Sequence, residues 1–278
     1  MKKDLKKLAL ELKQMIIEAA HDAGNQGVHI GGALSMTDIM AVLYGELMNY
    51  DIQNPSDKNR DRLVLSKGHD ALGLYVALCA SGFFSKEELK SNYLQDEGFL
   101  PTHPVKNIEN GIECSTGSLG QGLAYGIGLA IAAKKQGRKS RVFVVMGDGE
   151  CDEGSCWEGF TSAVHYGLDN LLLYIDLNGL QSDGATSEIM PIRIAAALDA
   201  IGWNVMEADG HDVDDLLSKS KKAMQESGRP SVIIAKTVKG KGVSFMENDN
   251  SWHHGHMNET QYEQAKKELA EGGHDGNQ

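Results

Sequence analysis

Apolar residues recur at helical spacing near the start of the chain. Over residues 4–23, apolar positions such as Leu8 and Leu12 repeat every three or four residues, and charged residues such as Glu11 interrupt them. This pattern predicts an amphipathic helix, because a signal peptide would carry an uninterrupted apolar block. Residues 36–48 have the same periodicity, so we expect a second helix there.

Short continuous apolar runs follow, which is typical of strands buried on both faces. Four of them lie at 141–149, 170–179, 203–210 and 230–240, and a fifth opens the stretch 63–82, which continues as a helix after a glycine. Helical stretches long enough for parallel crossovers lie between them at 155–167 and 212–227. The pattern predicts an α/β fold with a mainly parallel central sheet flanked by helices.

The chain contains neither an internal repeat nor an interdomain linker. The polar stretch 50–61 carries Pro55 and is expected to form a loop. We therefore predict a single domain over residues 1–265, followed by a flexible tail at 266–278.

Charge and composition exclude some partners. The 278 residues include 27 basic and 39 acidic side chains, for a net charge of −12. Such a surface repels nucleic acid and anionic membranes, and no apolar run is long enough for a membrane span. The four cysteines lack zinc-site spacing, which favours reduced thiols and a cytoplasmic protein.

Glycines flank an acid where one predicted strand ends. Gly147-Asp148-Gly149 follows the apolar run 142–146, and Asn178 ends the next predicted strand. Parallel sheets bind ligands beyond the carboxyl ends of their strands, so these side chains should meet there. A carboxylate, an amide oxygen and a backbone carbonyl suit Mg²⁺, with coordination positions left for phosphate oxygens. Taken alone, Gly-Asp-Gly could also be an ordinary turn.

Gly-Asp-Gly followed by this asparagine is the signature of thiamine diphosphate enzymes. The surrounding sequence, GDGECDEGSCWEGF with IDLNGLQSDG behind it, resembles the diphosphate-binding domain of the transketolase family. The likeness extends from about residue 8 to 255, with further matching segments at 26–44, 65–75, 99–104 and 115–130. It implies a thiamine diphosphate-binding fold.

The resemblance assigns roles around the diphosphate. Asp148 and Asn178 match the family's Mg²⁺ ligands, and Leu180 matches the residue that lends its backbone carbonyl. Gly149 and Asn178 would contact the cofactor. Glu153 matches a glutamate that faces the partner half and couples the cofactor sites.

Two further segments are expected to contact the cofactor. His69, in Ser66-Lys67-Gly68-His69, matches a histidine that approaches both the diphosphate and the substrate, although it could also cap a helix. Glycines recur within 117–128 and are costly inside a helix, so close packing must offset them. Gly117, Ser118 and Leu119 match the loop that passes beside the cofactor in the family.

The family's active site also contains histidines that act on sugar hydroxyls, a role that suits a group titrating near neutral pH. His29 and His103 match two of them, and His69 is a third. For the last position, in WHHGHMN, we choose His254 because it precedes a glycine, with His253 and His256 as competitors. The family's usual continuation after that glycine is absent.

The resemblance also implies a missing half. In transketolases the glutamate that activates the cofactor lies in a second, pyrimidine-binding domain, and this sequence has no counterpart after residue 250. We therefore expect the N-terminal subunit of a split two-chain transketolase, inactive alone and assembled into a heterotetramer with a C-terminal subunit. The reaction would transfer a two-carbon ketol unit from a ketose or ketose phosphate to an aldose.

Other functions remain open from the residues. The chain could belong to another thiamine diphosphate enzyme, such as a deoxyxylulose phosphate synthase or a 2-oxoacid dehydrogenase component. It could also be a non-catalytic partner subunit, although intact Asp148 and Asn178 argue against that. The histidine set favours polyhydroxylated substrates, and the sequence does not identify the sugar.

Overall fold

A computed structural model describes residues 4–272. The helices are α1 (Leu5–Asp22), α2 (Ile30–Ser35), α3 (Thr37–Val42), α4 (Ala71–Ala80), α5 (Lys86–Asn92), α6 (Gln121–Lys135), α7 (Gly154–His165), α8 (Thr186–Ile189), α9 (Ile194–Ile201), α10 (Val213–Ala223) and α11 (Glu259–Ala270). The strands are β1 (Arg62–Leu65), β2 (Val142–Gly147), β3 (Leu171–Leu177), β4 (Leu180–Gln181), β5 (Gly184–Ala185), β6 (Asn204–Asp209) and β7 (Ser231–Lys236). Short turns of other helix types include η3 (Gly68–Asp70), η5 (Gly149–Asp152) and η6 (Asn250–His253).

Five strands form one parallel sheet in the order β1-β2-β3-β7-β6. Each matches a predicted apolar run, so the predicted α/β fold with a mainly parallel sheet is confirmed. β4 and β5 form a separate antiparallel pair, and α8 follows them.

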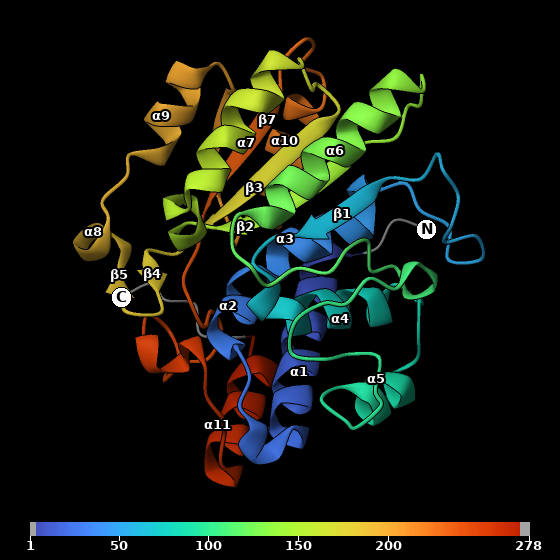
Figure 1. The fold of residues 1–278 in the computed structure, drawn as a ribbon. Helices are drawn as coiled ribbons and strands as arrows, with labels where there is room; N and C mark the ends of the chain where they lie inside the picture. The colour runs from blue at the N-terminus through green and yellow to red at the C-terminus, as the bar shows by residue number, and fades with distance from the viewer. Residues whose placement is uncertain (1–3, 273–278) are drawn as a thin grey trace.

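Helices cover both faces of the sheet (Figure 1), which explains why the central strands β2, β3 and β7 are mainly apolar. Alternate residues of one strand enter different cores: Phe143 and Val145 pack on the side of α1, α3, α4 and α10, whereas Val144 packs with α6, α7 and α9. The sheet is therefore the middle layer of three. Within the described residues, no helix is long and apolar enough to cross a bilayer.

The predicted boundary at residue 265 is wrong. α11 continues to Ala270, and both Ala265 and Leu269 are fully buried, because the helix packs its apolar side against α1. Residues 266–270 therefore belong to the domain. The rest of the predicted tail, from 273, lies outside the described residues.

Candidate active site

A cavity of about 380 Å³ opens at the carboxyl ends of β1, β2 and β3. It is the place where ligands bind in such sheets. Most of the predicted site residues line it, namely His29, His69, Gly117, Leu119, Asp148, Gly149, Glu153, Asn178 and Leu180. The chain thus brings together residues that are far apart in the sequence.

Asp148 follows β2 directly and is held by two backbone amides. Its Oδ1 accepts a hydrogen bond from Gly149 N at 2.9 Å, and its Oδ2 accepts one from Gly179 N at 2.6 Å. Burial, together with the negative charge of Asp176, raises the pKa of Asp148 to about 6. The fold therefore holds a carboxylate at a position that disfavours its charge, and a bound cation would relieve that cost.

Asn178 is oriented by its neighbours at the end of β3. The register pairs Gly147 with Asp176, which brings the residues after the two strands to the same edge. Asn178 Nδ2 donates to Asp176 Oδ2 at 3.2 Å, and its Oδ1 accepts from Leu180 N at 3.1 Å. The amide therefore presents its oxygen on the side of Leu180.

Gly149 allows a close approach beside this pair. A Cβ atom there would lie 2.7 Å from Gln181 Cβ, so any larger residue would push the Gln181 side chain away. Gln181 Oε1 is buried and has no hydrogen-bond partner, which is consistent with a missing ligand in this corner.

Two buried acids beneath the cavity were missed by the sequence analysis. Asp176 is fully buried and accepts hydrogen bonds from Ser35 Oγ at 2.5 Å, from Lys67 Nζ at 2.5 Å and from Thr237 Oγ1. An aspartate inside the apolar run LLLYIDL is the signal that could have revealed it, because a buried charge requires partners.

Glu150 is the second of these acids and joins three motif segments. Its Oε1 accepts from Ser66 Oγ at 2.5 Å and from Gly120 N at 2.8 Å, and its Oε2 accepts from Gly147 N at 3.3 Å. The carboxylate thus fixes the loop before α6 and the turn after β1 relative to the end of β2.

Histidine rings form a cluster at the other end of the cavity. The ring of His29 lies 5.0 Å from that of His69, 6.2 Å from His103 and 5.3 Å from His253, measured between centroids. His29 Nδ1 is buried and has no partner. His103 packs against Gly117, where a Cβ atom would lie 2.8 Å from the imidazole, and Gly117 has a φ of 147°.

The structure favours a different residue for the last histidine. His253 lines the cavity, and its Nδ1 lies 2.8 Å from Lys239 Nζ. His254, which we had chosen, is not among the lining residues. Its ring lies against Gly27, where a Cβ atom would be 2.7 Å from it, and 4.7 Å from the ring of His29. Both rings therefore lie against His29, and only that of His253 lines the cavity.

Lys239 is a further cavity residue that the sequence analysis missed. It is 3% exposed, and its Nζ donates to the carbonyl of Leu180 at 3.4 Å. Burial lowers its pKa. Ser118, by contrast, does not line the cavity, although Gly117 and Leu119 on either side of it do.

Acidification should destabilise the chain through His29 and His253. Burial lowers the pKa of His29 to about 3 and that of His253 to about 4. Unfolded histidine protonates near pH 6.5, so the unfolded state takes up protons first as the pH falls. The stabilisation is complete above about pH 6.5 and is lost as the pH falls toward about 3. The drop in melting temperature between pH 7 and pH 5 should be smaller in His29→Gln than in the unmodified chain.

The exposed His165 provides the control for this measurement. His165→Gln should leave the drop unchanged. If the melting temperature of His29→Gln fell by as much as that of the unmodified chain, burial of His29 would not disfavour its protonated form.

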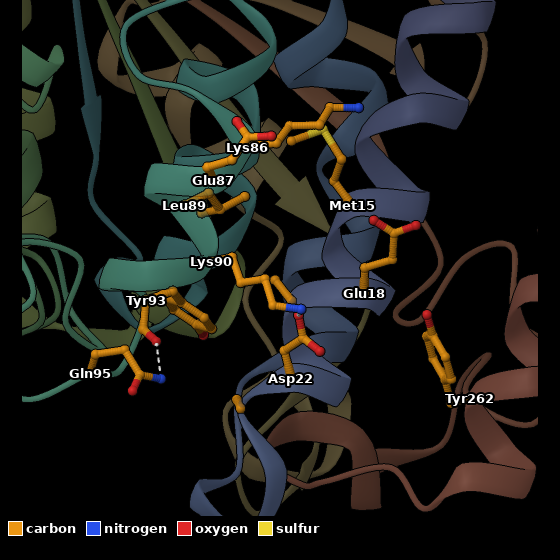
Figure 2. Close-up of a pocket in the computed structure, with 12 residues that line it drawn as sticks. Met15, Glu18, Asp22, Lys86, Glu87, Leu89, Lys90, Tyr93, Gln95 and Tyr262 are labelled. Atoms are coloured by element: carbon orange, nitrogen blue, oxygen red, sulfur yellow. Dashed lines mark hydrogen bonds and ion pairs between the residues drawn. The ribbon is translucent and has the colours of Figure 1, made fainter.

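A second cavity, of about 310 Å³, lies between α1 and α5 with Tyr262 of α11 at its edge (Figure 2). Its lysines are paired: Lys86 Nζ lies 3.1 Å from Glu11, and Lys90 Nζ lies 3.0 Å from Asp22. It contains none of the predicted site residues, so the cavity at the strand ends remains the candidate active site.

A model of the transketolase thiamine diphosphate-binding domain matches residues 6–275 of this chain. The chain belongs to this family. It is 38% identical over 273 residues to the 6-deoxy-6-sulfo-D-fructose transketolase subunit SqwG of Clostridium sp. MSTE9, covering 97% of this chain and 98% of the relative. It is 39% identical over 261 residues to an apulose-4-phosphate transketolase subunit of Phocaeicola vulgatus, covering 93% and 91%.

Solved structures of full-length transketolases share the fold. The transketolase of Leishmania mexicana superimposes with a TM-score of 0.90 at 27% identity, and that of Campylobacter jejuni with 0.88 at 29%. This transketolase-family chain spans only 42% and 43% of those two chains, whereas 97% of it is covered in each case. The predicted resemblance and fold are confirmed.

Proposed function

We propose that this chain is the N-terminal subunit of a two-chain transketolase that depends on thiamine diphosphate and Mg²⁺. The observation that carries the proposal is one cavity with oxygen ligands at one end and a histidine cluster at the other. The Clostridium and Phocaeicola relatives are both named as transketolase subunits, which supports a separate partner, and so does the 42% coverage of a full-length transketolase.

The residues at the strand ends fit a metal-bound diphosphate. Asp148, Asn178 Oδ1 and the Leu180 carbonyl would hold Mg²⁺, which prefers oxygen ligands and keeps phosphate oxygens among them. Among the described residues, no three His, Cys, Asp or Glu side chains form a metal cluster, and the proposed site has a single acidic ligand. The ammonium group of Lys239 adds positive charge close to the Leu180 carbonyl.

When bound, thiamine diphosphate supplies the electron sink for breaking a carbon–carbon bond beside a ketose carbonyl. The contribution of this chain is to orient and deprotonate hydroxyl groups. Burial lowers the pKa values of His29 and His253, so both rings are neutral near pH 7 and can accept hydrogen bonds from sugar hydroxyls. This suits a polyhydroxylated substrate better than a simple 2-oxoacid.

Replacing His103 by alanine should lower turnover and leave cofactor binding nearly intact. The residue lies beside the ring of His29 and does not itself line the cavity, unlike Asp148 and Asn178. A positioned acid–base group contributes about 10²- to 10⁴-fold, so kcat should fall by roughly that factor. Steady-state kinetics and cofactor titration of the same preparation separate the two effects. A kcat within about twofold of the unmodified enzyme would remove His103 from the chemistry.

An apolar helix surface supports the presence of a second subunit. Residues 121–133 of α6 carry no charge, yet Ala124, Tyr125 and Gly128 are exposed there. Tyr125 is 39% exposed, and a Cβ atom on Gly128 would meet nothing within 4 Å. Such a surface suits close packing against another protein. The occupant we propose is the subunit with the pyrimidine-binding and C-terminal parts, in a heterotetramer.

Four free, buried cysteines agree with assembly in the cytoplasm.

A substrate panel tests the proposed reaction. The chain is mixed with the product of the neighbouring gene, Mg²⁺ and thiamine diphosphate, and is offered xylulose 5-phosphate, apulose 4-phosphate or 6-deoxy-6-sulfofructose with an aldose acceptor. We expect cofactor-dependent ketol transfer from at least one ketose. Turnover of pyruvate with none of the ketoses would instead indicate a 2-oxoacid enzyme.

A further inference from the structure

Asp70 is a buried carboxylate at the histidine end of the cavity. It is 2% exposed and follows His69 in η3. Its Oδ2 lies 3.0 Å from Lys67 Nζ and 3.5 Å from His69 Nε2, whereas its Oδ1 is buried without a partner. Neither the metal end of the site nor the cofactor loop accounts for this residue.

The neighbouring helix is shaped around this carboxylate. A Cβ atom on Gly32 of α2 would lie 2.3 Å from both oxygens of Asp70, which is far inside contact distance. Only a glycine at position 32 therefore admits the acid in its present place. The two residues, separated in the sequence by β1, form one fitted pair.

Lys67 is shared between Asp70 and a second buried carboxylate. Lys67 is 1% exposed, and its ammonium contacts Asp70, Asp176 at 2.5 Å and the carbonyl of Gly32 at 3.1 Å. One lysine thus faces two carboxylates. Asp176 also accepts hydrogen bonds from three other side chains, including Asn178 at the metal end. On its other side, Asp70 Oδ2 faces His69 Nε2 at 3.5 Å.

We propose that Asp70 is a positioning residue that makes His69 a usable proton acceptor. When the O–H bond of a substrate hydroxyl breaks, the proton goes to the imidazole, the electron pair stays on the oxygen, and the new imidazolium charge is stabilised by the carboxylate 3.5 Å away. The catalytic meaning rests on the proposed function, whereas the electrostatic link between the two residues does not.

The other charges near His69 make this carboxylate necessary. Burial lowers the pKa of His69, and the positive charges of Lys67 and Lys239 lower it further, while Asp70 raises it. The groups that face His69 from the surrounding segments are Lys67, Asp70, His29, His103, Lys239 and His253. Without Asp70, a protonated His69 would lie near the ammonium groups of Lys67 and Lys239, with no adjacent carboxylate to offset their charge.

Histidine titration by NMR in the full chain tests the link without cofactor or partner. In Asp70→Asn, which keeps the shape of the side chain, the titration midpoint of His69 should fall by about one unit or more. Asp38→Asn is the matched control, because Asp38 is also buried and paired with a lysine and a histidine, Lys13 and His211. This control should leave His69 unchanged. An unchanged midpoint in a folded Asp70→Asn chain would overturn the proposal.

Gly32→Ala gives a second test, which also decides the matter if Asp70→Asn does not fold. Gly32→Ala should displace the carboxylate and lower the titration midpoint of His69. In Asp70→Ala the shorter side chain leaves room for a Cβ atom at position 32, so the double variant should have the same His69 midpoint as Asp70→Ala alone. With the partner subunit, Asp70→Asn should lower kcat, leave KM nearly unchanged and move the acid limb of the pH profile to lower pH. An unmoved limb together with an unmoved midpoint would leave Asp70 a packing role only.

Discussion

Asp148→Ala is expected to abolish Mg²⁺-dependent binding of thiamine diphosphate in the assembled enzyme. The substitution removes the one carboxylate of the proposed metal site and leaves Asn178 and a backbone carbonyl to hold a dication. Burial raises the pKa of Asp148 to about 6, so the carboxylate is still mostly ionised at pH 7 and a bound cation would further favour its charged form. Titration calorimetry of cofactor into the complex, with and without Mg²⁺, measures the loss.

Asp199 supplies a control on α9, where an exposed acid lies outside the cavity. Asp199→Ala should bind cofactor as the unmodified enzyme does. If Asp148→Ala retained the same Mg²⁺-dependent affinity, the proposed metal site would be wrong.

Gly128→Arg should separate folding from assembly. Nothing lies within 4 Å of a Cβ at this position, so arginine fits the isolated chain. Arginine is also the better helix former, and the free energy of unfolding should stay constant or rise by up to about 1 kcal/mol. A partner packed against α6 would meet the long charged side chain. We therefore expect no complex and no ketol transfer, as measured by mass photometry with activity assayed on each peak.

Ser218→Arg is the matched control, because Ser218 is exposed on α10, across the sheet from α6. It should assemble and turn over normally. The chain alone should be inactive in every variant. A fully active complex with Gly128→Arg would move the partner to another surface, and turnover by the chain alone would end the two-subunit proposal.

The regular part of the fold could be predicted because parallel strands have a distinctive sequence. A strand such as β2 is buried on both faces and is therefore an unbroken apolar run, and helices of crossover length separate such strands. The end of α11 was missed for a physical reason. The end of this helix contains few apolar residues, among them Ala265 and Leu269. Only the contact with α1 reveals that they are buried.

The position of Asp148 and Asn178 in the cavity could be predicted, because both follow strands whose carboxyl ends meet at one edge of the sheet. Their role in binding a metal stays a prediction. The site was not predictable where tertiary packing decides the role of a side chain. His253 and His254 have nearly the same sequence context, and only the folded structure shows that His253 lines the cavity whereas His254 does not. The pairing of Asp70 with Gly32 similarly depends on two segments that meet only in the folded chain.

The packing of α11 against α1 has a consequence for synthesis on the ribosome. α1 is the first described helix to be made, and α11 is the last. The part of α1 that buries against Leu269 must stay uncovered while more than 200 intervening residues are translated. In the sheet, β7 lies between β3 and β6, so these two strands cannot be connected until β7 has been synthesised. The nascent chain should therefore need protection from aggregation until its final helix has emerged.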